Sequence, residues 1–163
     1  MKKMPVLVLL ALASTSVLAS GTHDHSHDNG KVEFGVGKPV QGKPDRVIGV
    51  SMHDTMRYEF EPEFHELRAG EVIRFEVRND GRIVHEFSIG NAAEQKKHAE
   101  MMRKMPDMKH NDPNTVSLEP GESTTLTWRF DGDDTVVFAC NEPGHFEAGM
   151  HHSLDIELAD NSD

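Results

Sequence analysis

The sequence contains a single cysteine, few aromatic residues and a deficit of basic charge. Of its 163 residues, 6% are aromatic, and 28 acidic residues outnumber 17 basic ones, which gives a net charge of −11 with histidine neutral. One cysteine excludes an internal disulfide, and the acidic balance argues against nucleic acid as a partner. No apolar run reaches the roughly 20 residues that a membrane helix needs, so we expect no membrane insertion.

The first nineteen residues have the pattern of a secretory signal peptide. Lys2 and Lys3 precede an apolar run over residues 6–12, and Val17 and Ala19 fit the rule for cleavage after Ala19. Cleavage after Ser20 is the alternative, and it would leave Gly-Thr-His at the amino terminus as a square-planar cupric site. We therefore expect export to the periplasm and a mature protein that begins near residue 20, with a length that fits one domain.

Residues 20–45 are polar, rich in histidine at first and then interrupted by glycine and proline, and they predict an extended, flexible arm. Residues 46–163 are expected to form the folded domain. Short runs rich in valine, isoleucine, phenylalanine and threonine predict strands over residues 47–52, 58–67, 72–77, 85–89, 124–130, 135–139 and 154–158. Residues 92–105 contain strong helix formers and predict a short Met-rich helical insert in an otherwise all-β Greek-key sandwich or small barrel.

The residues from Cys140 to Met150 have the spacing of a copper-binding loop. Cys140, His145 and Met150 form a C-x4-H-x4-M pattern that directly follows the predicted strand 135–139. His85, on a separate predicted strand, would complete the His₂Cys set with a weak axial methionine that is typical of blue-copper centres. Each of these residues alone is commonplace, and the joint spacing is what indicates a metal site.

These motifs resemble those of the cupredoxin family, to which plastocyanin, azurin and rusticyanin belong, over about residues 46–158. The loop spacing is similar to that of rusticyanin-like members. The segments 54–57, 85–87, 101–108 and 143–150 together most resemble the periplasmic copper-tolerance cupredoxins of the CopI type. The resemblance implies a cupredoxin-like β-sandwich with one type 1 copper, cycling between Cu(I) and Cu(II), held by His85, Cys140, His145 and Met150.

Two features depart from the family pattern. Many cupredoxins have asparagine or serine directly after the first ligand histidine, where the side chain joins the two ligand loops, whereas this sequence has Glu86. A carboxylate at this position would affect the reduction potential and the colour of the site. His151 and His152, after Met150, are either further ligands or an exposed beginning of the last strand.

After removal of the signal peptide the chain would have eleven histidines and seven methionines, more than one copper centre needs, which suggests accessory copper sites. The soft thioethers of Met52, Met56, Met101, Met105 and Met108 would select cuprous ion, although hydrophobic packing explains these methionines equally well. His23, His25 and His27 in the arm would suit cupric or zinc ion.

Three functional classes compete. The first is a monomeric periplasmic protein that binds and redox-buffers copper in copper tolerance, with copper ions as its ligand and a copper transporter, a multicopper oxidase or a redox protein as its partner. The second is a soluble one-electron carrier of the azurin or rusticyanin kind. The third is a copper enzyme, which the sequence disfavours because Ala139 and Asn141 flank Cys140, where an oxidase motif needs histidines. Oxidase activity toward cuprous ion stays open.

Overall fold

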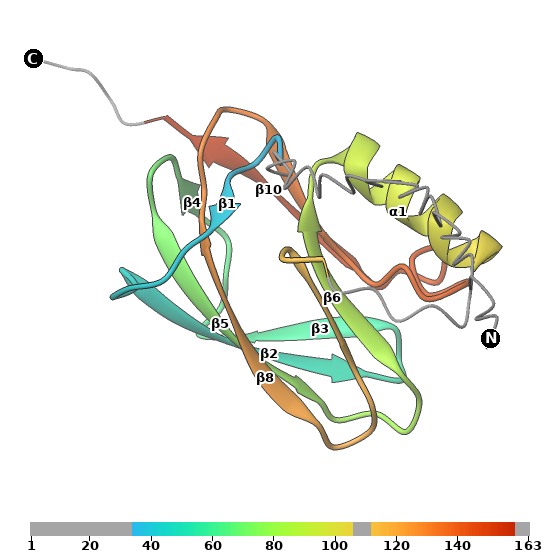
Figure 1. Ribbon diagram of the computed structural model, residues 1–163. Helices are drawn as coiled ribbons and strands as arrows, with labels where there is room; N and C mark the ends of the chain where they lie inside the picture. The colour runs from blue at the N-terminus through green and yellow to red at the C-terminus, as the bar shows by residue number, and fades with distance from the viewer. Residues whose placement is uncertain (1–33, 106–111, 159–163) are drawn as a thin grey trace, which may run out of the picture. The chain divides into compact units, whose positions relative to one another are not determined.

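The protein is a sandwich of two five-stranded β-sheets with one helix on its outside, as seen in the computed structural model for residues 34–105 and 112–158 (Figure 1). The first sheet contains, in spatial order, β1 (Lys38–Pro39), β8 (Ser123–Arg129), β5 (Val72–Asn79), β2 (Arg46–His53) and β3 (Arg57–Glu61). The second contains β4 (Leu67–Arg68), β10 (His151–Glu157), β9 (Thr135–Ala139), β6 (His85–Gly90) and β7 (Thr115–Leu118). The predicted all-β sandwich is confirmed.

Most strand pairs are antiparallel, but β2 pairs with β5 and β4 pairs with β10 in parallel. Within the second sheet, β9 lies between β6 and β10. The strand that ends just before Cys140 is therefore a direct neighbour of the strand that begins at His85. This adjacency brings two sequence-distant ligand candidates to one part of the sandwich.

The few aromatic residues are concentrated in the core between the sheets. The fully buried large side chains include Phe64, Phe75, Phe87, Trp128 and Phe138. The rings of Phe75 and Phe138 meet edge to face with centroids 5.5 Å apart, a favourable arrangement for aromatic pairs. The predicted alternation on β5 is also present, since Ile73, Phe75 and Val77 are all buried.

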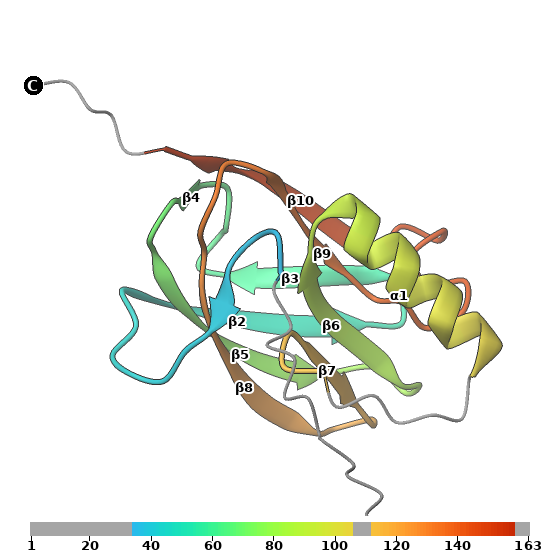
Figure 2. The same ribbon diagram turned by 45° about the horizontal axis from the view of Figure 1, so that its top comes forward.

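Strand β6 is buried along its whole length because both of its faces are covered. Phe87 and Ile89 belong to the core between the sheets, whereas Glu86 and Ser88 bond to residues of helix α1 (Ala92–Lys104) on the other side. Figure 2 shows this helix lying along the second sheet. The helix begins with a capping box, in which Asn91 accepts from the Glu94 N–H and Glu94 accepts from the Asn91 N–H. The predicted insert at residues 92–105 is confirmed.

Two strand predictions differ from the structure. The strand expected over residues 58–67 ends as β3 at Glu61, because Pro62 has no N–H to donate to a sheet, and the chain then crosses to the second sheet as β4. Strand β7 was not predicted, because its four residues between Pro113 and Pro120 are too few to show a period. It forms through pairing with β6.

The arm predicted for residues 20–45 needs a correction in its last part. Val36 is fully buried, the Trp128 Nε1–H donates to the Val36 carbonyl at 3.2 Å, and β1 pairs with β8. A buried indole N–H needs an acceptor, and this segment supplies it. Residues 20–33, with the signal peptide, lie outside the described residues. No helix among the described residues is long and apolar enough to span a bilayer.

Candidate metal centre

The ligand loop connects β9 to β10 and is closed by its own backbone hydrogen bonds. The Cys140 N–H donates to the Met150 carbonyl at 3.1 Å, and the Met150 N–H donates to the His145 carbonyl at 3.0 Å. Gly144 and Gly149 have φ values of 87° and 106°, a region that favours glycine. The two glycine turns thus fold the three loop candidates back on one another.

The structure brings His85, Cys140 and His145 together. One potential ligand atom from each residue lies within 4.8 Å of the others, and the Cys140 Sγ is 3.2 Å from His145 Nδ1. His85 and Cys140 are fully buried, and His145 is half-buried. Two imidazoles and a thiol at this separation are the donor set that suits copper in both oxidation states.

His85 shows which of its nitrogens is available for a metal. Its Nε2 lies 3.1 Å from Asp54 Oδ1, and because a carboxylate can only accept, Nε2 is the nitrogen that bears the proton. Its Nδ1 is buried without a hydrogen-bond partner among the described residues. A buried polar atom without a partner is costly, and a metal ion satisfies it. The imidazole is therefore oriented for ligation through Nδ1.

The Cys140 sulfur lies in a site that keeps it protonated until a metal binds. Burial raises the pKa of the Cys140 thiol to about 12, and the charges of Glu86 and Glu142 act in the same direction. The Glu86 N–H donates to the sulfur at 3.3 Å, which partly opposes this effect. Copper must displace the thiol proton, so binding couples to proton release.

His145 is held in the form that a metal needs. Burial lowers the pKa of His145, and the nearby His85 ring lowers it further. The neutral imidazole, which has a free lone pair, is therefore favoured. Met150 is fully buried in the hydrophobic core at the end of the loop. Its carbonyl accepts from the Cys140 N–H, and the ligation of a metal by its sulfur stays a prediction.

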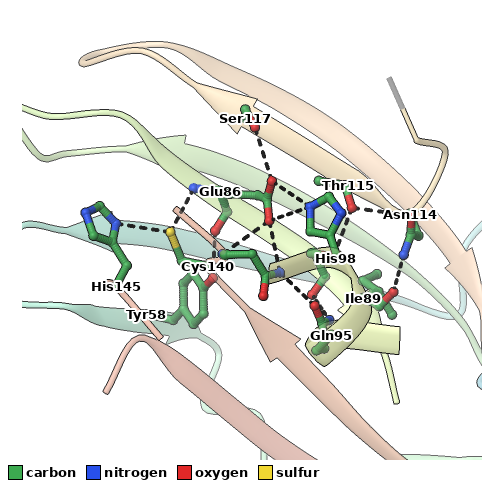
Figure 3. Close-up of polar contacts among 12 residues, drawn as sticks. Tyr58, Glu86, Ile89, Gln95, His98, Asn114, Thr115, Ser117, Cys140 and His145 are labelled. Atoms are coloured by element: carbon green, nitrogen blue, oxygen red, sulfur yellow. Dashed lines mark hydrogen bonds and ion pairs between the residues drawn. The ribbon is translucent and has the colours of Figure 1, made fainter. Parts of the chain in front are cut away.

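Glu86 joins the two ligand segments, as the family's asparagine or serine was expected to do. Its Oε1 accepts from both the backbone N–H of Asn141 at 3.3 Å and the Asn141 Nδ2 at 3.1 Å. Asn141 directly follows Cys140, and Glu86 directly follows His85. The departure from the family pattern therefore retains the connection between the loops and makes it through an acidic side chain. Figure 3 shows Glu86 beside Cys140.

The accessory candidates are dispersed. Met52 is fully buried in the core and Met56 packs against that core, whereas Met101 lies in α1, on the outer side of the second sheet, and Met105 is the C-cap of that helix. The structure does not bring the two groups together. In the helix Met102 is the buried methionine and Met105 is exposed, because Met102 shares the sheet-facing side with Gln95. Met108, His23, His25 and His27 lie outside the described residues.

His151 and His152 begin strand β10, in agreement with the simpler of their two interpretations. His152 Nε2 lies 3.0 Å from the Phe64 carbonyl, and His151 stacks on Phe146. Neither belongs to the His85, Cys140 and His145 group.

Sequence reasoning missed three residues around the site. Asp54 lies 31 positions before the His85 that it orients, and Asn141 was considered only as a flank of Cys140. His98 reaches Glu86 from α1 with an Nε2 to Oε2 distance of 3.1 Å. The acidic residue beside His85 was the one available signal, since a buried carboxylate requires partners.

Solved structures that superpose on this chain include auracyanins and a multicopper oxidase, and the two-sheet fold is cupredoxin-like. Auracyanin B superposes with a TM-score of 0.58 at 22% identity, over 76% of this chain and 96% of that chain. Auracyanin from Roseiflexus castenholzii gives a TM-score of 0.57 at 23% identity, over 71% and 99%. A multicopper oxidase from Campylobacter jejuni gives 0.50 at 13% identity, and the chain spans only 31% of it. These likenesses show the fold alone.

Curated relatives place the protein within that class. The copper-resistant cuproprotein CopI of Vibrio cholerae is 38% identical, over 95% of this chain and 99% of the relative. CopI of Rubrivivax gelatinosus is 42% identical, over 89% and 90%. No protein-family model matches the chain. The chain belongs to the CopI family of copper-resistant cuproproteins, and copper is the metal to which its donor set corresponds.

Proposed function

We propose that this protein binds copper at a type 1 centre formed by His85, Cys140, His145 and Met150 and thereby lowers toxic copper in the periplasm. One observation carries the proposal: within the described part of the chain the buried His85 Nδ1 has no hydrogen-bond partner, and His85 lies in the same close group as Cys140 and His145. The group matches the copper motif in the sequence. The part in copper resistance is inferred from the relatives, which are named copper-resistant cuproproteins.

The donor set explains how one site would hold copper in either oxidation state. Thiolate and thioether are soft ligands that suit cuprous ion, whereas imidazole suits both ions. Binding at this site would therefore buffer copper across both redox states. The site would also restrict the exchange of the metal with water, because His85, Cys140 and Met150 are fully buried.

We propose binding rather than catalysis as the role, because the relatives are named cuproproteins. Within residues 34–105 and 112–158, the histidine, cysteine and carboxylate side chains form one metal-type group, that of His85, Cys140 and His145. A multicopper enzyme needs further copper centres. The proposal of export is based on the signal-peptide pattern. It would be supported if the intact mass of protein isolated from the periplasm corresponded to a chain that begins near residue 20.

The first experiment is a stepwise copper titration of the mature protein with visible absorption and electron paramagnetic resonance. Wild-type protein should show thiolate-to-copper absorption that saturates at one equivalent, and Cys140→Ser should lose it, because a hydroxyl does not replace the thiolate. Absence of this absorption in the wild type would refute the site.

Copper tolerance is tested by deletion of the gene in the host. Poor growth in copper, restored by wild type and not by Cys140→Ser, would support the proposal. Normal growth in copper with impaired respiration would favour the electron carrier instead.

A further inference from the structure

Glu86 is an acidic residue buried completely beside the proposed copper centre. Its side chain is 0% exposed, and in Figure 3 it lies between Cys140 on one side and His98 on the other. A buried acid is rare unless it is paired, because leaving water penalises the charged form. Its retention next to a ligand therefore needs an explanation.

The hydrogen bonds of Glu86 indicate that it is a carboxylate. The Asn141 backbone N–H and Nδ2 both donate to Oε1, and neither group can accept. His98 Nε2 lies 3.1 Å from both oxygens, and the Ser117 hydroxyl is 3.4 Å from Oε2. Both carboxylate oxygens therefore lie within hydrogen-bond distance of groups that can donate to them, and hydrogen bonds to a carboxylate are strong.

Glu86 is linked to two of the proposed ligands, to His85 by a peptide bond and to Cys140 by hydrogen bonds. Glu86 is the residue after His85, and its backbone N–H donates to the Cys140 sulfur. The carboxylate bonds to Asn141, the residue after Cys140. The Glu86 carboxylate therefore belongs to the residue directly after the first imidazole and bonds to the residue directly after the thiol.

Helix α1 covers the carboxylate and keeps water away from it. His98 contacts Glu86, and Gln95 fixes the helix to the sheet through Nε2 bonds to the carbonyls of Ser88 at 3.1 Å and Val137 at 2.7 Å. The Gln95 Oε1 accepts from Asn141 Nδ2 at 2.8 Å, so the helix also holds the residue beside Cys140. A charge shielded from water acts much more strongly on its neighbours than an exposed one.

We propose that the buried Glu86 carboxylate favours the cupric over the cuprous state of the copper centre, with helix α1 as the cover that preserves this effect. Reduction adds negative charge at the metal and its thiolate, close to a fixed negative charge that solvent does not screen. His98, whose Nε2 contacts the carboxylate, lies on the far side of it from Cys140 (Figure 3). The inference rests on the proposed copper site and adds to it a residue that sets its redox preference.

The test measures cuprous and cupric affinities by competition with chelators, together with the reduction potential. Glu86→Gln keeps the side-chain length and removes the charge. It should raise the ratio of cuprous to cupric affinity at least about tenfold, which equals a potential about 59 mV more positive for one electron. Glu147→Gln is the matched control, since it removes an acid that is 66% exposed on the same loop, and it should change the ratio less than about twofold.

A second pair of variants separates charge from packing. Glu86→Asp and Glu86→Asn have the same shape and differ in charge, so the Asn variant should have the higher potential even where both bind copper less tightly. If Glu86→Gln does not fold, the comparison of Glu86→Asp with Glu86→Asn still tests the effect of the charge. Equal ratios within each pair, in proteins that keep the thiolate-to-copper absorption, would overturn the inference. Loss of that absorption in wild type would instead overturn the copper site itself.

Discussion

At the scale of single residues, the proposed centre depends on the different roles of the two nitrogens of His85. Asp54 engages Nε2 and leaves Nδ1 for the metal, so the imidazole cannot exchange tautomers freely. The Asp54 carboxylate is itself fixed by the Arg82 N–H, which donates to both of its oxygens at 2.9 Å. These backbone bonds are the main reason that the pKa of Asp54 is lowered, with His85 as a further contributor.

We predict that Asp54→Asn weakens copper binding by roughly 10- to 100-fold, the usual effect of losing a partner that orients a ligand histidine. The amide removes the charge and directs a donor or a weaker acceptor at Nε2. Competition with a chelator measures the effect. Asp80→Asn is the control, because Asp80 pairs with Arg78 rather than with a ligand. Equal affinities for the Asp54 variant and wild type would show that Asp54 does not orient His85.

At the scale of elements, helix α1 is attached to the sheet mainly through polar contacts. Gln95 and Met102 are its buried residues, and His98 adds its contact with Glu86. Burial by itself would lower the pKa of His98, but the hydrogen bond to Glu86 and the charges of Glu86, Asp112 and Glu142 outweigh it, and the pKa is raised. The folded protein therefore favours protonated His98.

We predict that His98→Ala lowers the free energy of unfolding of the metal-free protein by about 2–3 kcal/mol, because buried Glu86 loses a donor. A raised folded-state pKa stabilises the protein below the unfolded value near 6.5, and this part is lost as the pH rises through the folded value. The difference between wild type and variant should therefore be larger at pH 6 than at pH 9 in urea unfolding.

His65→Ala is the control for this prediction, since His65 is 71% exposed and pairs with Glu63 at the surface. It should change the free energy of unfolding by less than about 0.5 kcal/mol. A difference between wild type and His98→Ala that widens at pH 9 would contradict the assigned direction of the His98 pKa.

At the scale of the whole molecule, the centre lies where both sheets and the ligand loop meet. Cys140 and Met150 belong to the same hydrophobic cluster as Phe75 and Phe138. A metal that binds at the centre stabilises only the folded state, because the unfolded chain does not hold His85 near Cys140. Copper binding should therefore raise the free energy of unfolding of the whole protein.

We predict that copper at 1,000 times its dissociation constant stabilises the protein by about 4.1 kcal/mol and raises the melting temperature on the order of 10 °C. Calorimetry of the metal-free and copper-loaded forms measures the shift. Cys140→Ser should show a much smaller shift under the same conditions. Equal shifts in both proteins would mean that the stabilising copper binds elsewhere.

The sequence was sufficient for the sandwich, for the helical insert and for the family. Alternation on β5 and turn residues between short apolar runs are local signals, and the spacing from Cys140 to Met150 lies within one loop. The segment 34–40 and strand β7 were missed because their structure depends on partners distant in the chain. Val36 is buried in the core and its carbonyl accepts from the distant Trp128, and β7 pairs with β6.

By itself, the sequence determined which donor atoms are present and in which order, because residue types and loop spacing are local properties. The tertiary structure alone decided their environment. It oriented His85 through Asp54, joined Glu86 to Asn141 and covered the carboxylate with α1. These relations depend on strand order and helix docking, which place residues 12 to 55 positions apart within hydrogen-bond distance, and no local pattern encodes them.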